Sequence, residues 1–443
     1  MSIPRTLLIA LCALLLFGCA STVSLGSVEH PLSQGRYDEA VTALEANSKQ
    51  LESAQGPIVL ALDQGMVFHY ARQFDLSNRS LDNAEGLITD AFTKSITEGV
   101  ATYLVNDNAR TYPGEDFEDI YSNVFKSLNY QMLGKTEDAM VEIRRATEKQ
   151  QVLRDKYEKL SAKTAQAAKN NQVDGLSGDL VSIEFSHSAL ADYLGMLYSR
   201  RLGATADLSY FHGQVTSAFS SQPHLYPFSV PSRLDEELSV PSGKARVNVI
   251  AFSGLEPYKQ EVSQYLPVSR SGWMKIALPE MEGRQSMISR VDVSIGDERF
   301  TLDLLEDLSA VAKQTFALRL QDITNRTLIR ATMKAVGTSV IDVVGHGIAQ
   351  SASENDRQGW GLLADLATLF SSVFSVASEQ ADLRMSHFFP AMARVGGINV
   401  EPGVYDVTVE FKDASGFVVG RVIYKDYHVK EGGLNLVEAV CLR

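Results

Sequence analysis

Hydrophobic positions along this chain repeat with two different periods. From about residue 30 to residue 222, apolar residues recur every three or four positions, which predicts amphipathic helices. After residue 244 the period shortens to two in several runs, which predicts strands with one buried face. The two regimes meet at residues 223–243, a stretch with four prolines that we interpret as a linker. The pattern predicts an α+β protein with a helical first half.

The helical region, residues 30–222, contains a weak internal repeat. Gly65-x-x-Phe68 precedes Leu81, and Gly195-x-x-Tyr198 precedes Phe211. Small residues let paired helices approach, and a large residue fills the gap between them. The pattern resembles tetratricopeptide (TPR) repeats and implies a TPR-like α-helical solenoid. The spacing is uneven, so a generic helical bundle stays open as the alternative.

One predicted helix, residues 136–170, lacks glycine and proline and carries a long heptad stripe. We expect this stripe to pack against a neighbouring helix of the same chain, with self-association as the alternative. Its members are Ala139, Ile143, Ala146, Gln150, Leu153, Tyr157, Leu160, Thr164 and Ala167.

Strand patterns occur on both sides of a second helical stretch. Residues 290–295 alternate, and so does the run in which Tyr405, Val407, Val409 and Phe411 share one face. We expect residues 244–302 and 396–443 to form one antiparallel β-sandwich-like domain, with residues 303–395 as a helical insertion. The apolar run 361–379 is short for a membrane span and contains a carboxylate, which favours a buried helical hairpin over a transmembrane helix.

The N-terminus has the features of an export signal. Arg5 precedes an unbroken apolar run, residues 7–17, which is too short to span a bilayer, and Gly18 marks a cleavage edge. The sequence Leu-Phe-Gly-Cys ending at Cys19 resembles a bacterial lipoprotein signal. The resemblance implies cleavage after residue 18, a lipid on Cys19 and, because Ala20 follows, retention at the outer membrane. Residues 19–29, small and polar, are expected to form a tether.

Cysteine usage agrees with this interpretation. Of three cysteines, Cys12 would be removed with the signal, and a lipidated Cys19 could not pair with Cys441. We therefore expect no intramolecular disulfide and no cysteine-bound metal. The remaining thiol, on Cys441, is expected to be a small buried apolar group.

Composition limits the function classes. Apolar residues make up 45% and charged residues 21%, which is ordinary for a folded protein. The net charge of −13 and the absence of a basic cluster make nucleic acid an unexpected partner.

No catalytic or metal-binding signature is present. His-Glu-x-x-His and Gly-x-Ser-x-Gly are both missing. His346 lies between glycines, which fits either a loop near a site or a helix break. The acidic residues Glu115, Asp116, Glu118 and Asp119 lack EF-hand spacing, so we interpret them as helix-start residues that favour the macrodipole rather than as calcium ligands. We expect no cofactor and no enzyme activity.

The most distinctive segment, residues 377–397, carries charges in an apolar context. Glu379, Asp382 and Arg384 are the candidate structural or binding residues. We expect Asp382 and Arg384 to pair and to pin the insertion onto the sheet, an interpretation favoured over a binding site.

Taken together, the chain resembles a group of TPR-containing bacterial outer-membrane lipoproteins that has no assigned activity. The resemblance spans most of the chain and rests on the residues 114–118, 128–130, 141–145, 379–384 and 389–391. It implies no reaction. From the stacked helix pairs, whose concave face suits an extended peptide or a partner helix, we hypothesise a periplasmic scaffold held at the outer membrane by its N-terminal lipid, with other envelope proteins as partners in cell-envelope assembly. A small-ligand or glycan-binding lipoprotein is the alternative, and an envelope hydrolase using His346, Asp382 and Arg384 is a third. Oligomeric state is left open.

Overall fold

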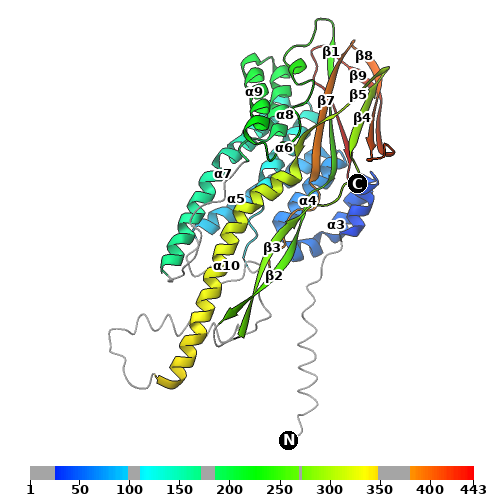
Figure 1. Cartoon of the computed structure of the whole chain (residues 1–443). Coiled ribbons are helices and arrows are strands. Elements are labelled where there is room, and N and C mark those ends of the chain that lie inside the picture. The colour runs from blue at the N-terminus through cyan, green and yellow to red at the C-terminus, as the bar shows by residue number, and fades with distance from the viewer. Residues whose placement is uncertain (1–24, 98–109, 171–184, 269–271, 348–379) are drawn as a thin grey trace, which may run out of the picture.

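The computed structural model describes residues 25–97, 110–170, 185–268, 272–347 and 380–443 (Figure 1). The fold is α+β, as the change in hydrophobic period predicts. Of the predicted segments, the signal, most of the tether and the apolar run 361–379 lie outside these residues.

In the first half, eight of the described helices form four consecutive antiparallel pairs. Each pair is joined by a short turn, and the second helix of each of the first three pairs also packs on the first helix of the next pair. The pairs are α2 (Gly26–Ser33) with α3 (Tyr37–Gln55), α4 (Pro57–Tyr70) with α5 (Phe74–Thr97), α6 (Asp116–Met132) with α7 (Thr136–Asn170), and α8 (Ala189–Leu202) with α9 (Thr205–Ser221).

The same turn closes all four pairs. One residue adopts a left-handed conformation, and the next backbone N–H bonds back to a carbonyl of the first helix, as in a Schellman cap. The left-handed residues are Gly35, Arg72, Gly134 and Gly203, and the returning N–H···O distances are 2.8–2.9 Å. Arg72 is the exception to glycine, and its guanidinium reaches the hydroxyl of Tyr424 at 3.1 Å.

Glycine also sets the spacing within two pairs. A Cβ at Gly195 would lie 2.7 Å from the ring of Phe211 on the partner helix, and Gly65 faces Leu81 in the same way. The stripe on α7 is buried from Ala139 to Tyr157 against the same chain. The prediction of intramolecular packing is therefore confirmed for this part of the helix.

In the part of the chain that the structure describes, ten strands make two four-stranded sheets and one separate hairpin. The first sheet has the order β10-β1-β7-β6, and the second has the order β5-β4-β8-β9. The strands of the first sheet are β1 (Ala245–Leu255), β6 (Asp303–Asp307), β7 (Pro390–Val400) and β10 (Asn435–Cys441). Those of the second are β4 (Arg290–Ile295), β5 (Glu298–Thr301), β8 (Gly403–Lys412) and β9 (Val418–Val429), and β2 (Tyr258–Val268) pairs with β3 (Gly272–Glu282).

The first sheet departs from the expected all-antiparallel arrangement, because β10 pairs with β1 in parallel. The last strand follows β9 of the second sheet after a short connection, residues 430–434, and runs beside β1 in the same direction. A further helix, α10 (Leu308–Gly347), follows β6 and packs on β3, β7, α6 and α7.

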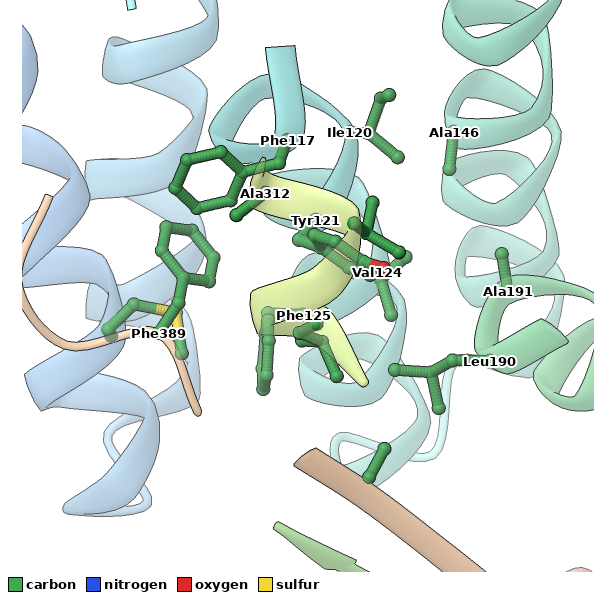
Figure 2. Close-up of a cluster of buried hydrophobic side chains, with 14 of the residues drawn as sticks. Phe117, Ile120, Tyr121, Val124, Phe125, Ala146, Leu190, Ala191, Ala312 and Phe389 are labelled. Atoms are coloured by element: carbon green, nitrogen blue, oxygen red, sulfur yellow. The ribbon is translucent and has the colours of Figure 1, made fainter. Parts of the chain in front are cut away.

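The first sheet is covered on both faces. One face, with Val247 and Val249, shares a core with Val293 and Val409 of the second sheet. The other face places Phe252 in the same core as the helices. The molecule therefore has three layers in the order helices, first sheet, second sheet. The buried cluster in Figure 2 lies between the helical layer, α10 and the chain entering β7.

Several elements cross the expected domain boundaries. Helix α2 starts at Gly26, inside the segment expected as a tether, and Val28 is fully buried. The proline-rich segment 223–243 packs on the body through Leu225, Tyr226 and Leu234. Strand β6 and the first half of β7 fall within the stretch expected to be helical, residues 303–395.

Candidate functional site: a buried connector held by carboxylates

The segment Gln380–Phe389, here called the connector, leads into β7 as an extended chain. It runs between α4 and α6 on one side and the β1–β2 turn on the other. Met385, Phe388 and Phe389 are buried, and Figure 2 shows Phe389 facing Phe117 of α6, with ring centroids 6.2 Å apart. The connector thus lies against α4 and α6, on the side of these helices that faces the sheet.

Three buried carboxylates hold the connector by its backbone. Each accepts a hydrogen bond from a connector N–H, and each comes from a different element: α4, α6 and the β1–β2 turn. The pairs are His387 with Asp63 at 2.8 Å, Ser386 with Glu118 at 2.6 Å, and Phe389 with Glu256 at 2.8 Å. Backbone recognition of this kind is independent of side-chain identity along the segment.

Side chains of the connector add to these contacts. The Nδ1 atom of His387 lies 2.7 Å from the second oxygen of Asp63. The Ser386 hydroxyl donates to Glu256 at 2.8 Å, and Tyr70 donates to the Phe388 carbonyl at 2.7 Å. The connector is therefore fixed on both sides at consecutive residues.

Two of the three carboxylates, Glu118 and Glu256, have a raised pKa. Burial raises the pKa of Glu118, and the nearby Glu115 carboxylate raises it further, against opposing hydrogen bonds from the backbone. Burial likewise raises the pKa of Glu256 well above its usual range, with Glu118 as the next contribution. Carboxyl groups this close in a dry site disfavour simultaneous ionisation.

Asp382 and Arg384 pair within the connector, which confirms that part of the prediction. The guanidinium makes two hydrogen bonds to the carboxylate, both of 2.8 Å. Burial acts to raise the pKa of Asp382, but the hydrogen bonds and charge of Arg384 outweigh it, so the pKa is lowered. The pair contacts more than the sheet, because Arg384 also donates to the Arg110 carbonyl at 2.9 Å and lies over the Tyr112 ring.

Three cations surround Tyr112. Lys259 of β2, Arg319 of α10 and Arg384 each lie 5.4–5.5 Å from its ring centroid. Glu115 neutralises part of this charge: it pairs with Arg319 at 2.8 Å and also with Lys259. The acidic residues lie at the start of α6, as predicted, and Glu115 and Glu118 also form a capping box there. In addition, Glu115 binds cations from β2 and α10.

A second junction between helices and sheet centres on Glu306 of β6. This carboxylate is fully buried and accepts hydrogen bonds from Ser188 at 2.8 Å, from the Leu190 N–H at 2.8 Å and from Tyr226 at 3.0 Å, as well as from Tyr121. A register shift between Leu304 and Glu306 accompanies this placement. Burial raises the pKa of Glu306.

Asp192 of α8 is a second carboxyl beside this junction. Burial raises its pKa to about 8, and the Glu306 charge adds to the shift. Among the described residues, its Oδ2 atom has no hydrogen-bond partner.

His69, at the end of α4, makes a third junction. Its ring nitrogens lie 2.6 Å from Glu438 of β10 and 2.6 Å from Asn129 of α6. Burial acts to lower the pKa of His69, but the charge and hydrogen bond of Glu438 outweigh it, so the pKa is raised. The connector contacts, the Glu306 junction and the His69 junction all tie the helices to the sheet, so the two halves form one interlocked unit.

A shallow pocket lies where α8, the proline-rich segment and both sheets meet. Its polar groups already bond to one another: Asp303 accepts two hydrogen bonds of 2.7 Å from Ser232, and Arg233 reaches the Gly397 carbonyl at 3.5 Å. The pocket does not present the convergent, available polar groups that a small-ligand site needs.

The other predicted positions are distributed as follows. Cys19 and Glu379 lie outside the described residues, and His346 belongs to the distal part of α10, where only the backbone is described. Asp63, Glu256 and Glu306 were missed by the sequence analysis. For Asp63, a lone carboxylate inside the apolar run IVLALDQG was the available signal, whereas Glu306 lies among other acidic residues in TLDLLEDLSA and gave none.

No known protein family matches this chain, and neither a curated protein nor a solved structure matches it. Within the described ranges, no helix combines the length and apolar character that a membrane crossing requires. In the same part of the chain, no three His, Cys, Asp or Glu side chains gather as metal ligands would.

Proposed function

We propose that this protein is an outer-membrane-anchored periplasmic lipoprotein that acts as a scaffold for protein–protein interactions in cell-envelope assembly. The observation that carries the proposal is the array of four helix pairs closed by one repeated turn. Such an array builds a continuous surface of parallel second helices, which suits protein docking. We further propose that the array is a TPR-like solenoid and that the two sheets form a sandwich-like support.

The docking surface in this proposal is the outer face of the second helices. The first helices α4, α6 and α8 are occupied by the sheet and the connector, whereas α7 and α9 present exposed apolar residues. Val141 is 45% exposed and Tyr210 is 52% exposed. They flank an ion pair between Arg144 and Asp207, 3.4 Å, that joins the two helices. We call this surface, residues Val141, Arg144, Asp207 and Tyr210, the outer helix face.

Site-specific photo-crosslinking in living cells tests the docking proposal. A photoreactive phenylalanine at Val141 or Tyr210 is expected to capture the same envelope protein. The matched control is Ile423 on β9, which is 51% exposed but belongs to the second sheet. Equal capture at all three positions, or none at the outer helix face, would contradict this docking surface.

The anchor has its own test. We expect the Cys19→Ser variant to leave the outer-membrane fraction, because a lipid on this thiol is the proposed attachment. A variant that still partitions with outer membranes would show that something other than this lipid holds the protein there.

A further inference from the structure

Two apolar side chains stand out from the surface of the second sheet and its approach. Of the large apolar residues that the structure describes, Phe417 and Met287 are the most exposed, at 72% and 59%. Val418, which follows Phe417 in the chain, is 41% exposed. We call these three residues the turn patch. Large apolar side chains that gather in one exposed place indicate a contact surface.

Arg443 brings the two parts of the turn patch together. Its main-chain oxygen accepts hydrogen bonds from the Met287 N–H at 3.2 Å and from the Ser286 hydroxyl at 2.9 Å. Its guanidinium donates to the carbonyl of Val419, the residue after Val418. Met287 and Val418 therefore lie on either side of the same residue.

The turn that carries Phe417 is well fixed. The carboxylate of Asp413 accepts hydrogen bonds from the N–H groups of Ser415 and Phe417, both at 2.9 Å. The Asp413 N–H in turn donates to the Phe417 carbonyl at 3.0 Å, and Gly416 between them has a φ of +86°. Since the turn is already ordered, a contact made by Phe417 pays little further entropy.

The turn patch adjoins the first described helix. The Arg443 guanidinium also donates to the carbonyl of Ser33, the last residue of α2, at 2.7 Å. Arg284, three residues before Met287, pairs with Glu29 of α2 at 2.7 Å. Figure 1 shows the same neighbourhood, with the end of the chain marked C beside the blue helices. The patch therefore lies at the α2 side of the body.

The proposed lipid is close to this helix. Leu25 is already buried and α2 begins at Gly26. Six residue steps separate Cys19 from Leu25, and a chain spans at most ~3.3–3.6 Å per residue, so this stretch reaches roughly 20–22 Å. Helix α2 has eight residues and, at ~1.5 Å per residue, is about 12 Å long. A membrane that holds a lipid on Cys19 is therefore within reach of the turn patch.

We propose that the turn patch lies on the membrane that holds the Cys19 lipid, with Phe417 in the headgroup–acyl boundary. The inference rests on the lipid anchor proposed above. Phenylalanine and other large apolar side chains are typical of protein surfaces that lie in this boundary. The chain has a net charge of −13, so apolar burial carries the contact rather than attraction to anionic lipid. Lipid and patch together fix which side of the body faces the membrane.

Tryptophan fluorescence at the turn patch provides the test. The full-length lipoprotein has two native tryptophans, Trp273 and Trp360, and both are changed to phenylalanine before Phe417→Trp is introduced. The protein is reconstituted into phosphatidylethanolamine–phosphatidylglycerol vesicles with brominated acyl chains and separated by flotation. We expect the floated protein to lose half or more of its emission relative to vesicles without bromine. Met287→Trp in the same background is a second probe with the same expected result.

The matched control is Val404→Trp in the same background. Val404 is 53% exposed and lies on the same β8–β9 hairpin, eight residues before the end of β8, which at ~3.4 Å per residue places it roughly 27 Å from the turn. Its emission should be unchanged by bromine, and thermal unfolding checks that all three variants fold alike.

The outcomes separate the patch from the anchor. Protein that floats with Phe417→Trp unquenched, or quenched no more than Val404→Trp, overturns the membrane contact of the turn patch and leaves the lipid anchor intact. Protein that does not float overturns the anchor and, with it, this inference.

Discussion

Asp192 offers a direct test of how burial controls stability in this fold. Asp192 lies on α8, and its carboxyl lies beside the buried Glu306 of β6. Its pKa is raised to about 8, first by burial and then by the Glu306 charge. The folded protein therefore holds a proton on Asp192 at pH values where the unfolded chain, with a pKa near 3.8, has released it. The stabilisation is present at low pH and is lost as the pH rises toward 8.

The magnitude follows from one proton. Each pH unit between the two pKa values changes the free energy of unfolding by about 1.36 kcal/mol. Between pH 5 and pH 7 this amounts to about 2.7 kcal/mol of lost stability from Asp192 alone. An asparagine at this position cannot ionise, so the Asp192→Asn variant should lack that part of the pH dependence.

Urea denaturation at pH 5, 6 and 7 measures the effect. Buried carboxyls that are not coupled to Asp192, such as Glu118, contribute equally to both proteins, so the difference between wild type and variant reports Asp192 and its coupling to Glu306. We expect the variant to gain about 2.7 kcal/mol relative to wild type from pH 5 to pH 7. The matched control is Asp207→Asn on α9, whose carboxylate is 47% exposed. If wild type and Asp192→Asn lose stability in parallel across this range, the carboxyl is not buried as described and the reasoning fails.

Two further predictions concern packing and the connector. Gly195→Ala should destabilise the protein by about 1–3 kcal/mol, because a Cβ there would meet the Phe211 ring at 2.7 Å. Gly213→Ala, with nothing within 4 Å, should instead stabilise by about 0.5–1 kcal/mol through helix propensity, and thermal unfolding of both variants checks the contrast in sign. Asp63→Ala removes an acceptor of the connector backbone and should accelerate tryptic cleavage after Arg384. Limited proteolysis of the folded protein, with the fragments identified by mass spectrometry, measures the rate. Unchanged cleavage would mean that this carboxylate does not hold the connector.

Features that depend on local pattern could be predicted from the sequence. The alternation in β8 correctly places Val407, Val409 and Phe411 on a buried face, because a strand with one solvated side shows its period directly. The Asp382–Arg384 pair was also predictable, since its partners are two residues apart. The apolar spacing on α7 likewise identified its buried side.

Features that depend on long-range pairing could not be predicted. The connector N–H of His387 bonds to Asp63, 324 positions away, and no local pattern encodes that partner. The parallel entry of β10 beside β1 is equally non-local. Helix α4 is buried along most of its length, so its apolar run has lost the one-sided period that would have indicated a neighbouring sheet.

The junctions at Glu306, Glu256 and His69 decide which surfaces are left for a partner. Removing one side of a buried hydrogen-bonded charge costs about 3–5 kcal/mol, and these groups lie between the helices and the sheet, so separating the layers would break several such contacts together. A partner therefore gains nothing by displacing the sheet from the first helices, and docking falls to the outer helix face. On the proposals made above, that face lies on α7 and α9, whereas the tether precedes α2. The proposed lipid on Cys19 would then hold the α2 end of the molecule at the membrane, with the outer helix face on later helices of the array. A rigid interlocked body keeps that face in one position relative to α2, because a flexible linker between the layers would leave the docking face free to tumble.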